Sequence, residues 1–260
     1  MAPSGYGNRV EGLHAVEAAA AAGRVTRLFV ESRRRGRSEI EAVIDQVGED
    51  RVSMVDDVRP LAETDAPQGL VADCKPILPV PLDHLVVERA AVIVLDHVQD
   101  PQNVGAITRS AAASGLTGMI VSSSRAAPLS AVAFKAASGA LERLPVAVVG
   151  SIPEALSRLK DRGLWVVGLD TAGTSELFDL ALLTEPVAIV IGAEGAGLSR
   201  LARARCDLVA SIPMANGSES LNASVSAALA GFEVLRVRRG GPGFPGAPVG
   251  PSGGSLSSGD

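Results

Sequence analysis

Six apolar runs recur from residue 90 onward, and they limit the possible folds more strongly than any other feature of the chain. Helical segments separate most of these runs, and the runs do not alternate between apolar and polar residues. Such runs are typical of strands that are buried on both faces of a parallel sheet. The sequence therefore predicts an α/β domain over residues 90–239, with mainly parallel strands in AAVIVLDHV, GMIVSS, VAVVG, LWVVGL, PVAIVIG and DLVASIPM.

A smaller α/β unit is predicted over residues 1–75. Residues 10–22 favour a helix, and the segment EIEAVIDQV favours a second one because its apolar residues recur on one face. Strands are expected in RVTRLFVES, RVSMV and GLVAD. The apolar face of the second helix consists of Ile40, Val43, Ile44 and Val47.

Two further segments are predicted to lie outside the domains. Pro76, Pro79 and Pro81 are spaced so that neither a helix nor a central strand can form, and we place a linker over residues 76–89. The last 21 residues, 240–260, contain 16 Gly, Pro or Ser. This tail can bury too little apolar surface to offset its ordering entropy, so it is predicted to be disordered.

The net charge of the chain argues against a protein that binds nucleic acid over its whole surface. The net charge is −5, whereas phosphate binding depends on clustered Lys and Arg. One such cluster exists, because six arginines between Arg24 and Arg37 stand against a single acid, Glu31, and give a local charge of +5. The cluster is either a solvated loop or an RNA contact, and the RNA-binding candidates in it are Arg33, Arg34, Arg35 and Arg37.

Several classes of protein are not supported by the sequence. No apolar stretch approaches the roughly 18 residues that a membrane span needs, and we expect a cytoplasmic protein without a membrane partner. Cys74 and Cys206 are isolated, so neither a disulfide nor a zinc site is expected, and both thiols are expected to be buried. The three histidines lie far apart in the sequence, so no metal is implied, and His97 is expected to be structural.

In an open parallel sheet, ligands bind outside the carboxyl ends of the strands, and two of these ends carry distinctive segments. In NVGAITRSA, Asn103 stands at an expected helix N-cap and Arg109 follows six residues later. In IGAEGAGLS, the glycines allow the backbone to approach a ligand, and Glu194 offers a carboxylate. The second segment lacks the spacing and the chain position of a dinucleotide fingerprint, so a nicotinamide-dependent enzyme is a weak alternative.

A third strand end is followed by the polar loop ANGSES and then by a helix of mostly small residues. One face of this helix carries an apolar stripe, formed by Leu221, Val225, Ala228, Phe232 and Leu235. A second face carries Ala223, Ala227 and Gly231, and these small residues predict close packing against another helix or backbone segment.

Together the three segments resemble the signature motifs of the SpoU branch of the SPOUT superfamily, which consists of trefoil-knotted RNA ribose 2′-O-methyltransferases. NVGAITRSA resembles the first motif, IGAEGAGLS the second and IPMANGSESLNASVSAA the third, in the expected order. The opening YGNRVEGLHAVEAA resembles the small RNA-binding domain that precedes the catalytic domain in many members. Ala223 and Ser226 stand where larger or purely apolar residues are common in the family, a change that removes no polar group.

The resemblance implies a fold, a cofactor and a set of site residues. The implied fold is a small α/β RNA-binding domain followed by a SPOUT domain with a C-terminal trefoil knot, in a homodimer whose active sites borrow groups from the partner. The implied cofactor is S-adenosylmethionine, with Gly192, Ile212 and Leu221 lining its pocket and Met214 nearby. Around the target ribose the resemblance places Asn103, Arg109, Glu194, Ser220 and Asn222.

The implied reaction raises a chemical question about Arg109. In the family its counterpart has been cast as the base that takes the ribose hydroxyl proton, but an arginine with a pKa above about 12 is a poor proton acceptor. A guanidinium that holds the adjacent phosphate and stabilises negative charge on the 2′-oxygen is physically easier. Glu194 could then accept the proton or orient Arg109.

The two-domain layout most resembles the branch that methylates a guanosine in the peptidyl-transferase region of 23S ribosomal RNA. A transfer RNA guanosine, another ribosomal loop and a non-catalytic RNA-binding or ribosome-assembly role remain open. Aromatic residues make up 3% of the chain, so a stacking platform for single-stranded RNA is not expected. Trp165 and Phe178 are predicted to belong to the core, and recognition is expected to depend on phosphate contacts and RNA shape.

Overall fold

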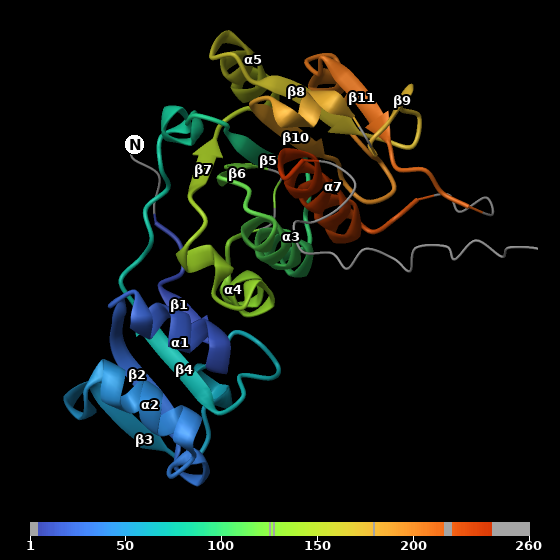
Figure 1. Ribbon diagram of the computed structural model, residues 1–260. Helices are drawn as coiled ribbons and strands as arrows, with labels where there is room; N and C mark the ends of the chain where they lie inside the picture. The colour runs from blue at the N-terminus through green and yellow to red at the C-terminus, as the bar shows by residue number, and fades with distance from the viewer. Residues whose placement is uncertain (1–4, 125, 127, 179, 216–219, 241–260) are drawn as a thin grey trace, which may run out of the picture.

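The computed structural model describes residues 5–124, 126, 128–178, 180–215 and 220–240. Two separate sheets form the centres of a small and a large α/β domain (Figure 1). The predicted tail beyond residue 240 and most of the polar loop ANGSES lie outside the described residues. The prediction of a trefoil knot stays a prediction.

The small domain contains a four-stranded mixed sheet in the order β1-β4-β2-β3. β4 pairs antiparallel with β1 and β2, whereas β2 and β3 are parallel. The predicted apolar face of the second helix is buried, since Ile40, Val43, Ile44 and Val47 are at most 2% exposed. The elements are β1 (Arg9–Glu11), α1 (Leu13–Ala21), β2 (Val25–Glu31), α2 (Ser38–Val47), β3 (Val52–Val55) and β4 (Leu70–Cys74), with the 3-10 helices η1 (Ser32–Arg34), η2 (Glu49–Arg51) and η3 (Arg59–Leu61).

The large domain contains a seven-stranded sheet in the order β7-β6-β5-β10-β8-β11-β9, and every pair in it is parallel. All six predicted strands are present, and the prediction of a parallel sheet is confirmed. The short edge strand β9 was not predicted because its two residues form no apolar run. The strands are β5 (Ala91–Leu95), β6 (Gly118–Ser122), β7 (Val146–Val149), β8 (Trp165–Leu169), β9 (Ser175–Glu176), β10 (Val187–Ile191) and β11 (Leu208–Ser211).

Helices cover both faces of this sheet. Ile189 of β10 belongs to an apolar cluster with α3, α4 and α7, whereas its neighbour Val190 belongs to a second cluster with α5 and α6. Each buried side chain of this size contributes about 1.5–3 kcal/mol, which explains why the strands lack polar alternation. The helices are α3 (Pro101–Ala113), α4 (Ala131–Ala137), α5 (Ile152–Asp161), α6 (Arg200–Arg203) and α7 (Ala223–Arg238), with the 3-10 helices η4 (Leu82–Leu85), η5 (Ala140–Glu142) and η6 (Ala181–Thr184).

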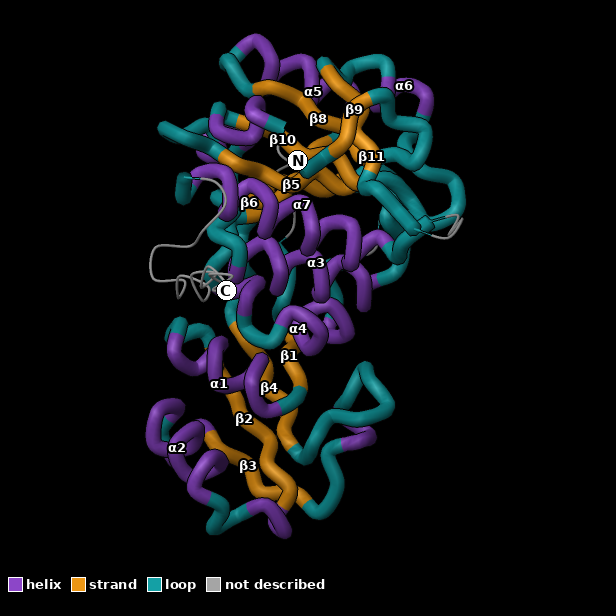
Figure 2. Tube along the Cα trace, turned by 45° about the vertical axis from the view of Figure 1, so that its right-hand side comes forward, coloured by secondary structure: helices purple, strands orange, loops and turns teal. Residues whose placement is uncertain are grey.

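The helices on one face pack closely through small residues, as predicted for α7. A Cβ atom on Gly231 of α7 would lie 2.5 Å from the Ser114 Oγ, just beyond the end of α3. A Cβ atom on Gly105 of α3 would lie 2.4 Å from the Ala133 carbonyl oxygen in α4. Figure 2 shows α3, α4 and α7 stacked between the large sheet and the small domain.

The apolar stripe of α7 faces outward instead of into the core. Val225 is 45% exposed and Phe232 is 46% exposed, whereas the small residues Ala223, Ala227 and Gly231 are buried. The helix therefore turns its small face to the protein and leaves Val225 and Phe232 partly exposed, whereas Val234 is buried.

A buried ion pair joins the two domains. The Arg24 guanidinium, at the end of the predicted arginine cluster, binds both carboxylate oxygens of Glu142 in η5, and the two side chains are 12% and 3% exposed. Arg24 also donates to the Gly7 carbonyl oxygen at 3.0 Å and lies over the Phe134 ring, 5.8 Å from its centroid. Arg24 therefore connects the domains and is not part of an open basic surface.

Three predictions about burial are wrong. Trp165 is 45% exposed because it is the first residue of β8, at the open amino end of the sheet, and Phe178 is 39% exposed in the turn after β9. Cys206 is only half-buried, whereas Cys74 is buried as expected.

Among the described residues, none of the helices has the length and apolar character that crossing a membrane requires.

Candidate active site

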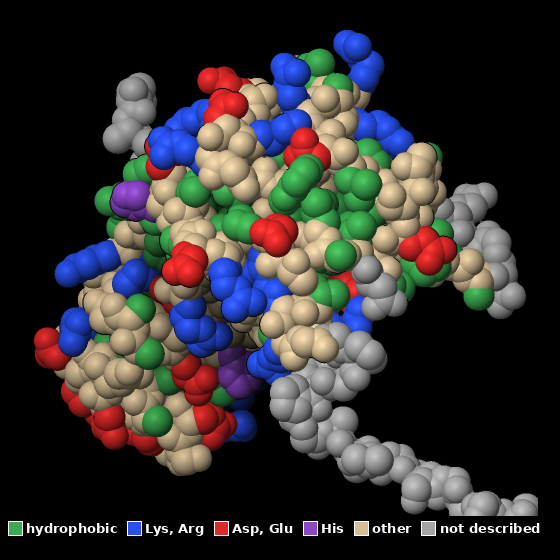
Figure 3. Space-filling model, turned by 45° about the horizontal axis from the view of Figure 1, so that its top comes forward, with side chains coloured by type: hydrophobic (Ala, Val, Ile, Leu, Met, Phe, Trp, Pro, Cys, Tyr) green, Lys and Arg blue, Asp and Glu red, His purple; other side chains and the backbone are tan. Residues whose placement is uncertain are grey.

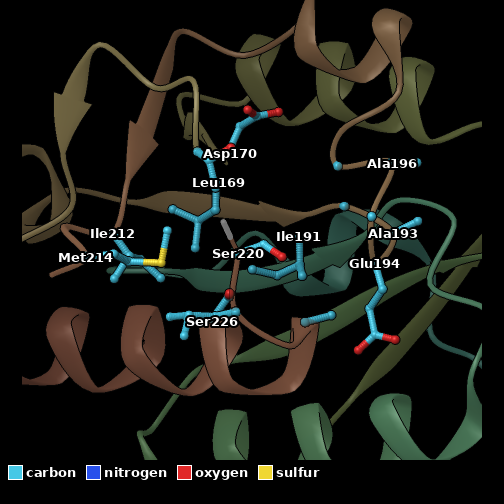
Figure 4. Close-up of a pocket in the computed structure, with 16 residues that line it drawn as sticks. Leu169, Asp170, Ile191, Ala193, Glu194, Ala196, Ile212, Met214, Ser220 and Ser226 are labelled. Atoms are coloured by element: carbon cyan, nitrogen blue, oxygen red, sulfur yellow. The ribbon is translucent and has the colours of Figure 1, made fainter. Parts of the chain in front are cut away.

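A pocket lies at the carboxyl ends of β8, β10 and β11, the edge of the sheet where ligands were expected (Figure 4). Its walls come from the ends of these strands, from the loop after β10 and from the first turn of α7. The predicted cofactor residues Gly192, Ile212, Met214 and Leu221 all line it, together with Glu194 and Ser220. In the close-up, Ile212 and Met214 stand at one end and the Glu194 carboxylate at the other.

The loop after β10 owes its shape to glycine. A Cβ atom on Gly192 would lie 2.2 Å from the Gly197 carbonyl carbon, so no larger residue fits there. Ala193 and Gly197 close the loop with two backbone hydrogen bonds of 3.1 and 2.8 Å. Gly195 and Gly197 have positive φ angles of 74° and 65°, a backbone conformation that favours glycine. The loop thus presents its backbone, and not bulky side chains, to the pocket.

The carboxylate of Asp170 also lines the pocket, and the sequence reasoning missed it. One of its oxygens, Oδ2, lies 2.8 Å from Arg203 Nη1, and the other accepts a hydrogen bond of 2.9 Å from the Ala172 N–H. Asp170 is the first polar residue after the apolar run LWVVGL. The rule that ligands bind outside the carboxyl ends of parallel strands also applies to Asp170, which directly follows β8.

Asn222 connects all three motif segments beside the pocket. Its side-chain amide donates to Asn103 Oδ1 at 3.1 Å and to the Glu194 carboxylate. Its carbonyl oxygen accepts from Ser224 N–H at 2.8 Å and from Ser224 Oγ at 2.6 Å, and so caps the amino end of α7. The structure therefore brings Asn103, Glu194 and Asn222 together, next to Ser220 in the pocket wall.

The prediction that Asn103 is a helix N-cap is wrong. The cap of α3 is Asp100, whose side chain accepts a hydrogen bond of 2.8 Å from the Gln102 N–H. Pro101 explains the difference, since proline favours the first helical position and holds the preceding residue in an extended conformation. Asn103 instead lies within the first turn, where it is 6% exposed and turned toward Asn222.

Arg109 is not brought to this pocket within one chain. It is exposed on α3, where it lines a different hollow between the two domains. Arg109 is six positions after Asn103, and at about 100° per residue the two side chains leave the helix in different directions. Arg109 makes no hydrogen bond or ion pair with any other residue that the structure describes.

The predicted arginine cluster is partly neutralised by acids outside the segment in which it was counted. Arg35 pairs with Glu41 at 3.2 Å and also with Glu49, and its hydrogen bond holds the pKa of the Glu49 carboxyl below its usual value. Arg33 Nε lies 2.6 Å from a Glu31 oxygen. Of the four arginines named as RNA-binding candidates, Arg34 and Arg37 form no ion pair with a described residue, so these two are left open for an RNA contact.

His97 belongs to a hydrogen-bonded cluster at the end of β5. Its Nδ1 lies 2.8 Å from an oxygen of the buried Asp96 carboxylate, and the other oxygen accepts a hydrogen bond of 2.7 Å from Ser199 N–H. This arrangement ties the end of β5 to the segment before α6. Across the described part of the chain, no group of three or more His, Cys, Asp or Glu side chains could hold a metal ion.

Sequence comparison identifies both domains. The SpoU rRNA Methylase family matches residues 90–232, and a domain described as RNA 2′-O ribose methyltransferase substrate binding matches residues 9–79. An uncharacterised tRNA/rRNA methyltransferase of Mycobacterium avium is 47% identical over 151 residues, which are 58% of this chain and 48% of the relative. The chain thus spans about half the length of the curated relatives it matches.

Solved structures of a SpoU methyltransferase and of an rRNA methyltransferase superimpose on nearly the whole chain. The SpoU methyltransferase AviRb from Streptomyces viridochromogenes, in complex with AdoMet, has a TM-score of 0.76 and 31% identity, and the match covers 90% of this chain and 91% of that one. An AdoMet-bound rRNA methyltransferase from Sinorhizobium meliloti has a TM-score of 0.72 and 27% identity, with 88% and 87% covered.

Proposed function

Because the chain belongs to the SpoU rRNA methylase family, we propose that it transfers the methyl group of S-adenosylmethionine to the 2′-hydroxyl of a ribose in RNA. The observation that carries this proposal is the hydrogen bonding of Asn222 to both Asn103 and Glu194 at the rim of the pocket. Three polar groups from three motifs meet there beside a glycine-walled cavity. The solved neighbours with AdoMet bound support the choice of cofactor.

The pocket fits a nucleoside cofactor with an apolar body and polar ends. Gly192 lets the backbone of the loop fold tightly against Gly197 at the pocket wall, and Ile212, Met214 and Leu221 provide apolar walls. Asp170 and Glu194 place carboxylates in the lining, and these suit hydroxyl and ammonium groups. When bound, S-adenosylmethionine supplies a methyl group on a positively charged sulfur, which is activated for transfer to an oxygen.

Arg109 is proposed to act on the pocket of a second copy of the chain. Within one chain it lies away from the pocket, and the outward apolar stripe of α7, with Val225 and Phe232, offers a surface for a homodimer. In this arrangement the guanidinium holds the RNA phosphate next to the target ribose and stabilises charge on the 2′-oxygen. In the same proposal Glu194 receives the hydroxyl proton, and Ser220 and Asn222 orient the ribose.

The proposed substrate is a guanosine in the peptidyl-transferase region of 23S ribosomal RNA, so that the enzyme takes part in ribosomal RNA processing in the cytoplasm. The match of residues 9–79 to an RNA substrate-binding domain supports an RNA substrate. Transfer RNA is the second candidate, because the curated relatives are called tRNA/rRNA methyltransferases.

The deciding experiment measures transfer of labelled methyl from S-adenosylmethionine to unmodified large-subunit ribosomal RNA and to transfer RNA side by side. Resistance of the product to alkaline cleavage identifies a methylated ribose. Label in ribosomal RNA supports the proposal, and label in transfer RNA keeps the reaction but changes the substrate. No label together with no cofactor binding would indicate a non-catalytic RNA-binding protein.

A further inference from the structure

A hollow of about 820 Å³ lies between the two domains and shares no lining residue with the pocket at the strand ends. Its walls come from α1 of the small domain, from α3, and from residues 137–143 at the end of α4 and around η5. Figure 3 shows Lys and Arg side chains gathered near the place where the two lobes meet. The hollow is therefore bounded by both the substrate-binding and the methylase domains.

Alanine side chains make up most of the lining, so the few polar groups decide what the hollow can bind. His14 and Glu17 stand on α1, Arg109 on α3 and Arg143 directly after η5. His14 Nδ1 lies 3.1 Å from a Glu17 oxygen, so the one acidic group in the lining already has a neighbour in the small domain.

The two arginines in the lining are exposed, and neither has a hydrogen-bond or ion-pair partner among the described residues. In this they differ from Arg33 and Arg35 of the predicted cluster, which are paired with glutamates. Two unpaired guanidinium groups beside one hollow create a positive potential that favours an anion with several acceptor oxygens.

We propose that this hollow holds a phosphate of the RNA strand next to the ribose that is methylated, and that Arg143 is a substrate-binding residue. The proposal rests on the proposed function, because Arg109 lines this hollow and is also the residue proposed to act in methyl transfer. RNA backbone is favoured over a small free anion because the hollow is far larger than one phosphate and is open along both domains.

The ion pair between the domains holds Arg143 in place. Glu142 directly precedes Arg143 and binds the guanidinium of Arg24, which also donates to the Gly7 carbonyl oxygen. Glu142 is thereby directed into the domain interface, while the next side chain, Arg143, is exposed in the hollow. The position of Arg143 relative to α1 is thus set by a buried contact.

The test compares wild type with Arg143→Ala and Arg143→Lys in the full chain. Binding of unmodified large-subunit ribosomal RNA and transfer RNA transcripts is measured between about 50 and 200 mM salt. For Arg143→Ala we expect about tenfold weaker binding and a slope of log affinity against log salt that is smaller by about 0.7–0.9. Arg143→Lys should keep most of the slope, since it keeps the charge.

Methyl transfer separates this role from a structural one. For Arg143→Ala we expect a higher KM for RNA with little change in kcat and with unchanged S-adenosylmethionine affinity by calorimetry. The matched control is Arg205→Ala, which removes another exposed arginine whose side chain has no described partner, in the segment between α6 and β11 and outside the lining of the hollow. The control should leave both KM and the salt slope unchanged.

The outcomes distinguish this inference from the proposed function. If wild type methylates RNA but Arg143→Ala keeps its KM and salt slope, the hollow is not an RNA site, although the enzyme assignment stands. If Arg143→Ala loses RNA affinity while wild type transfers no methyl group, the hollow is an RNA site and the reaction is wrong. If inorganic phosphate binds to wild type but Arg143→Ala leaves RNA binding intact, the hollow takes only free anions and the proposal fails.

Discussion

The side-chain amide of Asn222 lies 3.1 Å from Asn103 Oδ1, and this hydrogen bond joins residues that are 119 positions apart in the chain. The same amide binds Glu194, while the Asn222 carbonyl oxygen caps α7. One side chain therefore holds the start of a helix and connects the polar groups of the site.

Asn222→Asp is expected to separate these two roles. Aspartate caps a helix as well as asparagine does, but it cannot donate to Asn103, and it places a second carboxylate beside Glu194. We expect α7 to keep its cap and methyl transfer to fall at least tenfold. Asn222→Ala should lose activity and also about 1 kcal/mol of stability, as measured by denaturant unfolding. Full activity in Asn222→Asp would show that the donor has no role.

Gly192→Ala is expected to abolish or strongly weaken S-adenosylmethionine binding. Its Cβ atom would lie 2.2 Å from the backbone of Gly197, so the loop that walls the pocket must move. Calorimetric titration with the cofactor measures the effect. Gly150→Ala serves as the control, because a Cβ atom there meets nothing within 4 Å and the residue has no positive φ angle. Equal affinities for the two variants would contradict the assignment of the pocket.

Arg109→Ala and Arg109→Lys should both lose turnover and keep cofactor affinity, since lysine lacks the planar guanidinium fork. The proposed exchange of Arg109 between copies has a sharper consequence. When Arg109→Ala and Asn222→Ala chains are co-expressed, each mixed dimer should contain one intact active site. Random pairing then restores roughly a quarter of wild-type activity. If the mixture stays as inactive as the separate variants, Arg109 does not act on the partner.

Glu142→Ala should destabilise the protein by about 3 kcal/mol, because it leaves the buried Arg24 guanidinium without its carboxylate. Urea unfolding measures this loss, and two separate transitions would indicate that the domains have come apart. Glu49→Ala is the matched control, since it breaks the exposed pair with Arg35 on the surface of the small domain. The control should change stability very little.

Stability should fall as the pH rises above about 9. Burial raises the pKa of the Cys74 thiol from 9.0 to about 12, and burial raises the pKa of the Tyr6 hydroxyl from 10.0 to about 12. The folded state thus retains protons that the unfolded chain releases, so stability is present below pH 9 and is lost between pH 9 and about 12. Unfolding of Cys74→Ala should depend less steeply on pH above 9. The same slope in both proteins would assign the loss to other groups.

Much of the fold could be predicted because a strand that is buried on both faces of a sheet needs a run of consecutive apolar residues, and such runs are visible in the sequence. Strands such as β10, in which Ile189 and Val190 are both fully buried, must consist of apolar residues. The edge strand β9 contains no such run, because it consists of the two polar residues Ser175 and Glu176. Trp165 was misassigned because an apolar run does not reveal that its first residue lies at an uncovered end of the sheet.

The site was predicted less completely because its contacts join distant segments. The residues of the cofactor pocket were implied by the resemblance to the SpoU motifs, but the meeting of Asn222 with Glu194 depends on how α7 returns to the sheet. The pairing of Arg35 with Glu41 and Glu49 depends on the fold of α2 and η2, so the net charge of a sequence segment overstated the open positive surface.

The buried pair between Arg24 and Glu142 joins the two lobes and helps to fix the spacing between them. A fixed spacing means that the small domain and the strand-end pocket contact the RNA at a constant distance from each other. On the proposed function, the nucleotide to be methylated would be chosen by its distance along a folded RNA from the part that the small domain holds. Inserting residues between the lobes of a Glu142→Ala chain, in which this ion pair no longer holds them, should move the modified position and leave the chemistry intact.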